Sequence, residues 1–197
     1  MNNKKYIPYI IGAVIVVMGL YLITTYNGLV KKDEKVKVQW SEVQNAYQRR
    51  LDLIPNLVNT VKGNAGFEQN TLQEITEARA KANFVNVSAN NVSANAYNAQ
   101  TQAQDELAAS ANRLLITVEK YPELQGTKAF TTLQTQLERT ELRIKVARKD
   151  FNEAIQYYNS SVRGFPTKMI GGIFGFAPKN GFQSDAGAEK STEIKFK

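Results

Sequence analysis

The 197-residue sequence contains no cysteine and no histidine. The missing cysteine excludes disulfides, thiolate nucleophiles and cysteine-ligated zinc or iron–sulfur sites. The missing histidine removes the commonest general base and the usual metal ligand. Catalysis of the Ser-His-Asp or Cys-His type is therefore excluded, as is the Glu-x-x-His signature of di-iron bundles. We predict a protein that is not an enzyme and that has no cofactor and no metal site.

The N-terminal part also lacks charge, because no Asp, Glu, Lys or Arg occurs from Tyr6 to Val30. A bilayer core of about 30 Å needs roughly 20 apolar residues in a helix, which this stretch supplies. A cleaved signal peptide is the alternative, but the apolar run is long and no small-x-small site follows it before Lys31. We predict a single-pass membrane anchor over residues 1–30, with apolar residues that include Ile7, Ile10, Ile11, Val14, Ile15, Val17, Leu20 and Leu22.

The orientation of the anchor follows from the basic residues that flank it. Lys4 and Lys5 precede the span, whereas six basic residues follow it within about 20 residues, which favours a cytoplasmic C-terminal side. In the competing interpretation, the short basic N-terminus is cytoplasmic and the rest of the chain lies outside.

Beyond the anchor the apolar residues recur at helical spacing. One stripe runs through Val36, Trp40, Val43, Tyr47, Arg50/Leu51, Ile54, Leu57/Val58 and Val61, and glycines 63 and 66 end it. No turn signal separates this helix from the anchor, so the two can be continuous. Pro55 lies inside the pattern and is expected to kink the helix or to restart it near Asp52.

Three further helices are predicted. The second begins near Phe67 and buries Leu72, Ile75, Ala78/Arg79 and Ala82, and the third carries Leu107, Ala111, Leu114, Val118 and Tyr121 before Pro122 stops it. Residues 83–100 are rich in Asn, Ala and Ser and are predicted to form a loop or frayed helix. The fourth helix, residues 128–163, keeps heptad spacing from Phe130 to Val162.

These patterns predict an all-α fold. It consists of one N-terminal transmembrane helix, an antiparallel four-helix bundle with long coiled-coil-like helices over residues 31–164, and a C-terminal segment over residues 165–197. If the second and third helices were fused, the bundle would have three helices instead.

Several motifs, in this order along the chain, resemble the LemA family of bacterial membrane-anchored proteins. They are Tyr26-Asn27-Gly28-Leu29-Val30, Trp40, the block Gln48-Arg49-Arg50-Leu51-Asp52-Leu53-Ile54-Pro55-Asn56-Leu57-Val58, Glu119-Lys120-Tyr121-Pro122, Thr140-Glu141, Tyr158-Asn159, Phe165-Pro166 and Phe174-Gly175-Phe176. The block from 48 to 58 is specific to the family, and its site residues here are Arg49, Arg50, Asp52, Pro55 and Asn56. Phe151-Asn152 departs from the family, which usually has Tyr-Asn.

The resemblance implies a single-pass anchor in a bacterial cell membrane, followed by an antiparallel helical bundle. It implies no reaction, because the family has no established enzymatic activity. One branch of the family is associated with specialised intracellular membranes.

Three sets of residues could carry function, and each also has a structural interpretation. Arg49, Arg50 and Asp52 could form a binding site, or Arg50 and Asp52 could pair locally or with a neighbouring helix. Glu138 and Glu141 could hold a metal, but surface ion pairs with nearby basic residues are the stronger expectation. The aromatic residues Trp40, Tyr47, Phe151, Tyr157 and Tyr158 could line a cavity, although core packing is expected.

The net charge of +7 does not point to nucleic acid, because acidic and basic residues are mixed along every predicted helix of the soluble part. The sequence also has no glycine-rich phosphate loop between a predicted strand and a predicted helix. We therefore expect neither nucleic acid nor a small-molecule substrate as partner, and an anionic membrane surface suits the charge at least as well.

Residues 165–178 are too apolar for a free linker and too rich in Gly and Pro for a long helix. An up-down-up-down bundle would return this segment to the bilayer beside the anchor. Its candidate contact residues are Phe165, Met169, Ile170, Ile173, Phe174 and Phe176. They could lie in the membrane interface, pack on the anchor of a neighbouring subunit, or cap the end of the bundle. A three-helix arrangement would place them far from the membrane.

These observations lead to one main functional hypothesis and two alternatives. The main one is a membrane-anchored scaffold that acts through homo-oligomerisation and helix-mediated contacts and organises the membrane. An adaptor that presents the bundle to another membrane protein, such as a protease or signalling kinase, is the second. An enzyme that uses carboxylates alone is the third and has the least support.

Overall fold

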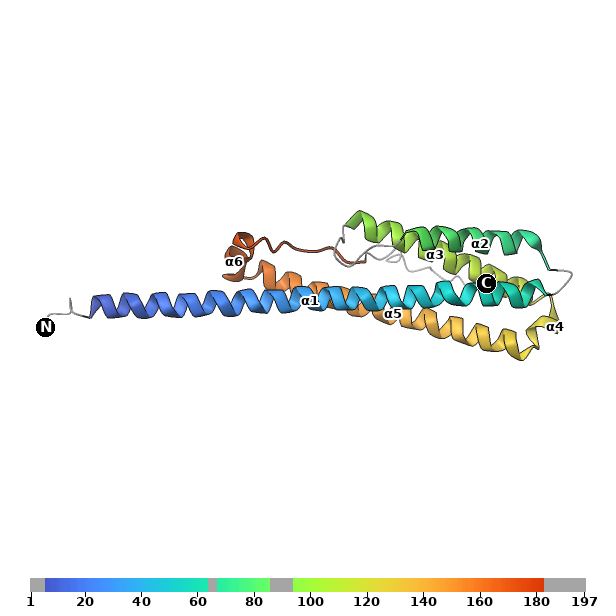
Figure 1. Cartoon of the computed structure of the whole chain (residues 1–197), viewed down its shortest axis with the longest axis horizontal. Helices are drawn as coiled ribbons and strands as arrows, with labels where there is room; N and C mark the ends of the chain where they lie inside the picture. Colours follow the sequence, from blue (N-terminus) through green and yellow to red (C-terminus); the bar gives the residue numbers. More distant parts are fainter. Residues whose placement is uncertain (1–5, 64–66, 86–93, 183–197) are drawn as a thin grey trace, which may run out of the picture.

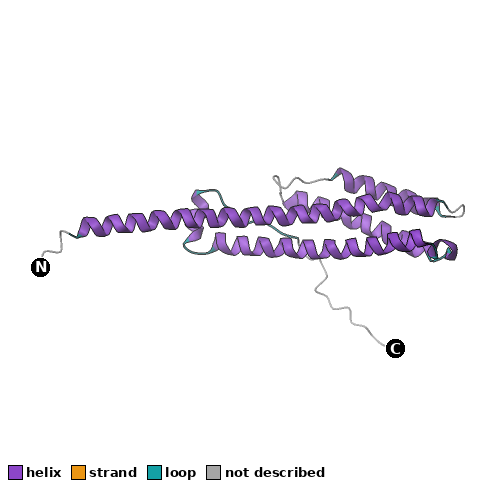
Figure 2. Cartoon of the chain, turned by 60° about the horizontal axis from the view of Figure 1, so that its bottom comes forward, coloured by secondary structure: helices purple, strands orange, loops and turns teal. Residues whose placement is uncertain are grey.

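The computed structural model describes residues 6–63, 67–85 and 94–182 (Figure 1). This part of the chain is helical and contains no strand (Figure 2), which confirms the all-α prediction for it. Its helices are α1 (Ile7–Lys62), α2 (Gln69–Phe84), α3 (Ala94–Val118), α4 (Pro122–Gln125), α5 (Lys128–Arg163) and α6 (Thr167–Ile173).

Helix α1 is one continuous helix of 56 residues that contains both the predicted anchor and the first helix of the bundle. At 1.5 Å per residue it is about 84 Å long, and its N-terminal end projects beyond the other helices (Figure 1). This projecting part is long and apolar enough to cross a membrane by length and composition, and its most apolar window is not buried. The predicted continuity between anchor and bundle is confirmed.

Helices α1, α2, α3 and α5 alternate in direction along the chain (Figure 1). The most extensive packing joins α1 to α5, while α2 and α3 form a shorter antiparallel pair against the C-terminal half of α1. Because α2 and α3 are separate helices, the alternative in which they fuse into one is wrong. Helix α5 returns toward the projecting part of α1, where Lys32 Nζ contacts Ser161 Oγ, and it brings α6 there.

The buried residues form two groups along this axis. The group nearer the projecting part joins α1 to α5 through Leu29, Val36, Trp40, Val43, Tyr47, Ile144, Phe151, Ile155, Tyr158 and Val162, with Tyr97 from α3. The distal group adds residues of α2, α3 and α4 to Leu51, Ile54, Leu57 and Val61. Every large residue of the predicted α1 stripe is buried except Val58, which is partly buried, because 3.6-residue periodicity places the stripe on one face.

The predicted helix ends agree with the structure except in the Asn-rich stretch. Helix α5 spans the predicted 128–163, and the Thr127 side chain accepts a hydrogen bond from the Phe130 N–H, as an N-cap does. Residues 83–84 end α2 and residues 94–100 belong to α3, so of the predicted loop or frayed helix the loop is wrong there, and residues 86–93 lie outside the described part. Packing of Tyr97, which is 5% exposed, outweighs the weak helix propensity around it.

Pro55 does not restart α1 near Asp52, because the helix continues through it. A proline has no N–H to donate to the carbonyl four residues earlier, which here belongs to Leu51. Arg79 of α2 donates from its Nε to that Leu51 oxygen at 3.0 Å. The neighbouring helix thus supplies the hydrogen bond that the proline removes.

Candidate functional site

Arg50, from the predicted family block, lies at the centre of the bundle and is 1% exposed. Its Nε donates to Glu141 Oε1 of α5 at 2.7 Å, and its Nη2 donates to the other carboxylate oxygen. Its Nη1 donates to the backbone oxygen of Gln104 at 2.8 Å and to the Gln104 side chain at 3.0 Å. One buried guanidinium therefore joins α1, α3 and α5.

The other residues of the block lie apart from this centre. Arg49, Asp52 and Asn56 are exposed, and Pro55 is partly buried. Asp52 accepts a hydrogen bond from Gln48 Nε2 at 2.8 Å, so the local pairing of Arg50 with Asp52 is wrong, whereas pairing of Arg50 with a neighbouring helix is observed.

Glu138 and Glu141 also have different surroundings. Glu141 pairs with buried Arg50, so its expected place in a surface ion pair is wrong, while exposed Glu138 accepts a hydrogen bond from Gln134 Nε2 at 3.1 Å. Their separation of three residues places them near one face of α5, but only Glu141 is turned toward α1.

Four of the five aromatic residues predicted for the core are buried there. The rings of Trp40 and Phe151 lie 5.3 Å apart, and that of Tyr97 is 4.5 Å from Trp40. Burial raises the pKa of Tyr47 against the opposing effect of Arg148, and burial also raises the pKa of Tyr97. Tyr157 is 65% exposed, so its core assignment is wrong, because the adjacent position on α5 points about 100° away from the buried Tyr158.

The predicted anchor residues lie on the projecting part of α1. The described side chains among them are exposed, at 60% for Ile10, 54% for Val14 and 59% for Leu20. The side chain of Ile7 lies outside the described part. A helix that is apolar on its whole circumference and packs on nothing within the described chain suits a lipid environment.

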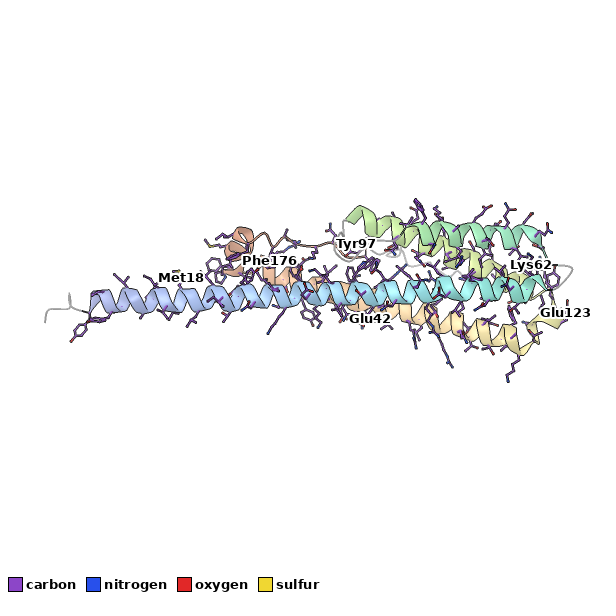
Figure 3. The ribbon with its side chains drawn as sticks, in the orientation of Figure 1. Met18, Glu42, Lys62, Tyr97, Glu123 and Phe176 are labelled. Atoms are coloured by element: carbon purple, nitrogen blue, oxygen red, sulfur yellow. The ribbon has the colours of Figure 1, made fainter. Side chains whose placement is uncertain are left out.

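The candidate contact residues of the C-terminal segment lie beside α1, at the point where its projecting part meets the rest of the bundle. Rings of Phe174 and Phe176 lie 5.0 and 5.7 Å from the ring of Tyr26, and Figure 3 shows Phe176 between α6 and α1. Ile170 is buried and Phe176 is partly buried, whereas Phe165, Met169, Ile173 and Phe174 are 86%, 66%, 79% and 51% exposed. The segment thus packs on helix α1 of its own chain.

Helix α6 ends in a Schellman motif that sends the chain back along the bundle. Gly175 has φ of 78°, in the left-handed region that favours glycine. The N–H of Phe176 donates to the Gly171 oxygen at 2.8 Å, which is the hydrogen bond that defines this motif.

Residues 176–182 then form an extended strap along α5, held by two asparagines one heptad apart. The Asn159 side chain donates to the Lys179 oxygen at 2.7 Å and accepts from the Lys179 N–H at 2.8 Å. The Asn152 side chain makes the same pair of bonds with Phe182, at 3.1 and 2.8 Å. The Phe182 ring lies 5.4 Å from Phe151 in the aromatic cluster. The seven-residue spacing of Phe151-Asn152 and Tyr158-Asn159 is the sequence signal from which these asparagine hydrogen bonds could have been predicted.

A groove of about 640 Å³ lies outside the core, between α1 and α5. Its lining comes from these two helices alone: Gln39, Glu42, Asn45, Ala46, Arg49, Leu142, Arg143, Val146, Ala147 and Asp150. Leu142 and Val146 are 63% and 50% exposed. Figure 3 shows Glu42 on the side of α1 that faces away from α2 and α3, so the rest of the described chain leaves this groove open.

Comparisons with known proteins find matches that cover most of this chain. A sequence model of the LemA family matches residues 39–196. The chain is 22% identical over 144 residues to the protein LemA of Metamycoplasma hominis, which covers 73% of this chain and 62% of that protein. It is 25% identical over 179 residues to the magnetosome proteins MamQ 2 and MamQ 1 of Paramagnetospirillum magneticum, which covers 82% of this chain and 66% of each of them. The chain therefore spans less than two thirds of the length of these relatives.

Proposed function

The chain belongs to the LemA family, and from that premise we propose that it is a membrane-anchored, non-catalytic scaffold that acts by self-association. Residues 7–30 cross the membrane once, with the helical bundle on the cytoplasmic side. The exposed apolar part of α1 supports the span, and the excess of Lys and Arg after it supports the side. Protease protection of the bundle in inverted and right-side-out vesicles tests the side directly.

The observation that supports self-association is the open groove between α1 and α5. It combines exposed Leu142 and Val146 with the small residues Ala46 and Ala147, so a second helix can approach closely. The area that this groove can bury is small for a stable dimer in solution. Confinement of the anchored chains to membrane surfaces raises their effective concentration and compensates for a weak contact.

The charges in the groove favour an antiparallel pair of chains. The ring contact of Trp40 with Phe151 places Glu42 at the level of Asp150, nearer the span. The Arg50–Glu141 pair places Arg49 at the level of Arg143, farther from it. In a parallel pair these like charges would face each other, whereas an antiparallel pair brings acids to bases, and such complementarity sets orientation.

An antiparallel pair has its two anchors at opposite ends, so that it joins two membrane surfaces. The groove is centred near residue 44, about 27 Å from Tyr26 near the end of the span and about 27 Å from the distal end of α1 at 1.5 Å per residue. The distal end of each chain then just reaches the membrane of its partner. We therefore propose that the scaffold holds membranes about 54 Å apart, twice the distance from Tyr26 to the centre of the groove.

Cysteine crosslinking between vesicles tests this arrangement, because the chain has no native cysteine. Vesicles that carry the full chain with Gln39→Cys are mixed with vesicles that carry Arg49→Cys. We expect crosslinks between the two variants and few within either one. A parallel pair would instead crosslink each variant to itself and would overturn the proposed orientation.

Clustering of the vesicles provides the second measurement. Val146→Asp is expected to abolish clustering by placing a charge in the groove, whereas Ile116→Asp, at a site on α3 that is 61% exposed, is the matched control and should leave it unchanged. A chain that neither clusters vesicles nor crosslinks to itself would contradict the scaffold. The adaptor alternative would then remain, with the groove available to a different membrane protein.

A further inference from the structure

The segment that connects α5 to the strap exposes apolar side chains on one face of α6 and on the turn that precedes it. Phe165, Met169 and Ile173 are spaced by four residues and are 86%, 66% and 79% exposed. The opposite face packs inward, because Ile170 is 6% exposed and a methyl group added to Gly171 would lie 3.8 Å from Val162 Cγ1. Within the described chain nothing covers the exposed face.

The position of this segment along α1 coincides with one end of the proposed span. Tyr26, which contacts Phe174 and Phe176 through its ring, lies 20 residues after Tyr6. That separation corresponds to about 30 Å of helix, the thickness of a bilayer core. Tyrosine rings favour the boundary between lipid and water. The exposed face of α6 therefore lies at the level of the lipid headgroups.

Basic side chains surround this level. Lys31, Lys35, Arg163 and Lys168 are exposed, and the ion pairs among the described residues include none of them. The nearby acids have partners, since Asp33 pairs with Lys37 and Lys179, and Glu34 pairs with Lys37. The local excess of positive charge attracts anionic lipid headgroups within a Debye length of the surface.

We propose that residues 165–174 form a membrane-interface foot that binds anionic phospholipid. Phe165, Met169 and Ile173 insert among the headgroups of the leaflet from which α1 emerges, and the four basic side chains contact the lipid phosphates. Continuity with the span and the surrounding positive charge select lipid as the occupant rather than a second protein chain. The foot rests on the proposed function only in that residues 7–30 must cross the membrane.

The foot also gives the bundle a second point of contact with the bilayer. The first contact is the place where α1 leaves the lipid, and the second is α6, which follows α5. Because α1 and α5 pack along most of their common length, two contacts fix the tilt of the bundle against the membrane. A bundle held at a fixed tilt presents its α1–α5 groove in a defined direction.

Tryptophan fluorescence in proteoliposomes tests the foot on the full chain. The native Trp40 is 0% exposed and provides a constant background. Phe165→Trp is the reporter, Val14→Trp reports the span, and Ile116→Trp is an exposed control on α3. The vesicles contain phosphatidylcholine and phosphatidylglycerol with bromine atoms on the acyl chains near the headgroups. We expect a blue shift and strong quenching for Phe165→Trp and neither for Ile116→Trp.

The span reporter separates the two ways in which the experiment can fail. Quenching of Val14→Trp without quenching of Phe165→Trp would overturn the foot and leave the anchor intact, whereas loss of both would overturn the anchor as well. A Phe165→Cys chain that crosslinks to the span of a second copy, without quenching of Phe165→Trp, would also overturn the foot and identify protein as the occupant.

Lipid composition and charge test the second part of the proposal. In vesicles of phosphatidylcholine alone, or with Lys168→Glu in the reporter chain, the quenching of Phe165→Trp should fall while that of Val14→Trp stays the same. Equal quenching in both lipid mixtures would overturn the role of anionic headgroups. Glu138→Lys, which adds positive charge on α5 far from the foot, is the matched control and should leave the lipid dependence unchanged.

Discussion

Arg50 and Glu141 form a two-bonded ion pair across the centre of the bundle, although they are 91 residues apart in sequence. The side chain of Arg50 is 2% exposed and that of Glu141 is 39% exposed. Such a pair costs desolvation energy and contributes little net stability, but the loss of one partner leaves the other charge uncompensated. We expect this pair to fix the register of α1 against α5.

We expect Glu141→Gln to lower the free energy of unfolding by about 2–3 kcal/mol, below the ~3–5 kcal/mol of fully buried pairs because Glu141 is partly solvated. Denaturant unfolding of the full chain in mild detergent measures this change. Glu138→Gln, three residues earlier and exposed, should change it by less than about 0.5 kcal/mol. If both variants were equally stable, the pair would not contribute to register.

Arg79 and Pro55 provide a second stability prediction. Arg79→Met leaves the Leu51 carbonyl without its donor and should cost about 1–2 kcal/mol. In a Pro55→Ala chain the restored N–H of residue 55 can bond to that carbonyl, so the same substitution should cost less. A double-mutant cycle measures the difference by denaturant unfolding. An equal cost in both backgrounds would show that Arg79 stabilises the bundle by another contact.

Local patterns predicted the helices well, because the burial of one helical face leaves a periodic record in the sequence. The stripe from Val36 to Val61 and the heptads of α5 both correspond to buried residues. Periodicity could not tell that Glu141, rather than Glu138, faces a buried arginine, because that partner lies on a helix 91 residues away.

The strap was missed for a similar reason. Its hydrogen bonds come from asparagine side chains to the backbone of an irregular segment, and such a segment has no period of its own. The position of residues 165–178 beside α1 was one of the predicted possibilities, because the alternation of helix directions alone brings the end of α5 back to the projecting part of α1. The predicted contact with a neighbouring subunit depends on a second chain and stays a prediction.

The buried Tyr97 predicts a loss of stability in alkaline solution. Burial raises its pKa, so above the unfolded value of about 10 the unfolded chain loses the phenolic proton while the folded chain retains it. Stability is then fully present below pH 10 and falls as the pH rises through the folded pKa. Tyr97→Phe removes the titrating hydroxyl, so its unfolding midpoint should fall less between about pH 9 and about pH 11 than that of the parent chain.

The matched control for this prediction is Tyr157→Phe. Tyr157 is 65% exposed on α5, so removal of its hydroxyl should leave the alkaline decline of the parent unchanged. An equally steep decline in the Tyr97→Phe chain would show that other groups, including the buried Tyr47 with its raised pKa, account for the whole effect.

The last prediction concerns Gly181 and Asn152 at the strap. A Cβ atom on residue 181 would lie 2.4 Å from Asn152 Oδ1, closer than two atoms can approach, so Gly181→Ala must displace the strap or the asparagine side chain. Either movement breaks the two hydrogen bonds between Asn152 and Phe182. We expect Gly181→Ala and Asn152→Ala each to accelerate hydrogen exchange at the Phe182 amide by about tenfold, for a loss of about 1.4 kcal/mol.

The combination of the two substitutions distinguishes this clash from general loosening of the strap. In an Asn152→Ala chain the obstructing oxygen is absent, and the next contact of the added methyl group, with Ile155 Cδ1 at 3.5 Å, is an ordinary one. Gly181→Ala should therefore add almost nothing in that background, and the double variant should exchange at the rate of Asn152→Ala alone. Exchange at the Lys179 amide, which Asn159 holds separately, should change less than at Phe182 in all three chains. Additive effects at Phe182 would mean that residue 181 needs glycine for a reason other than the hydrogen bonds between Asn152 and Phe182.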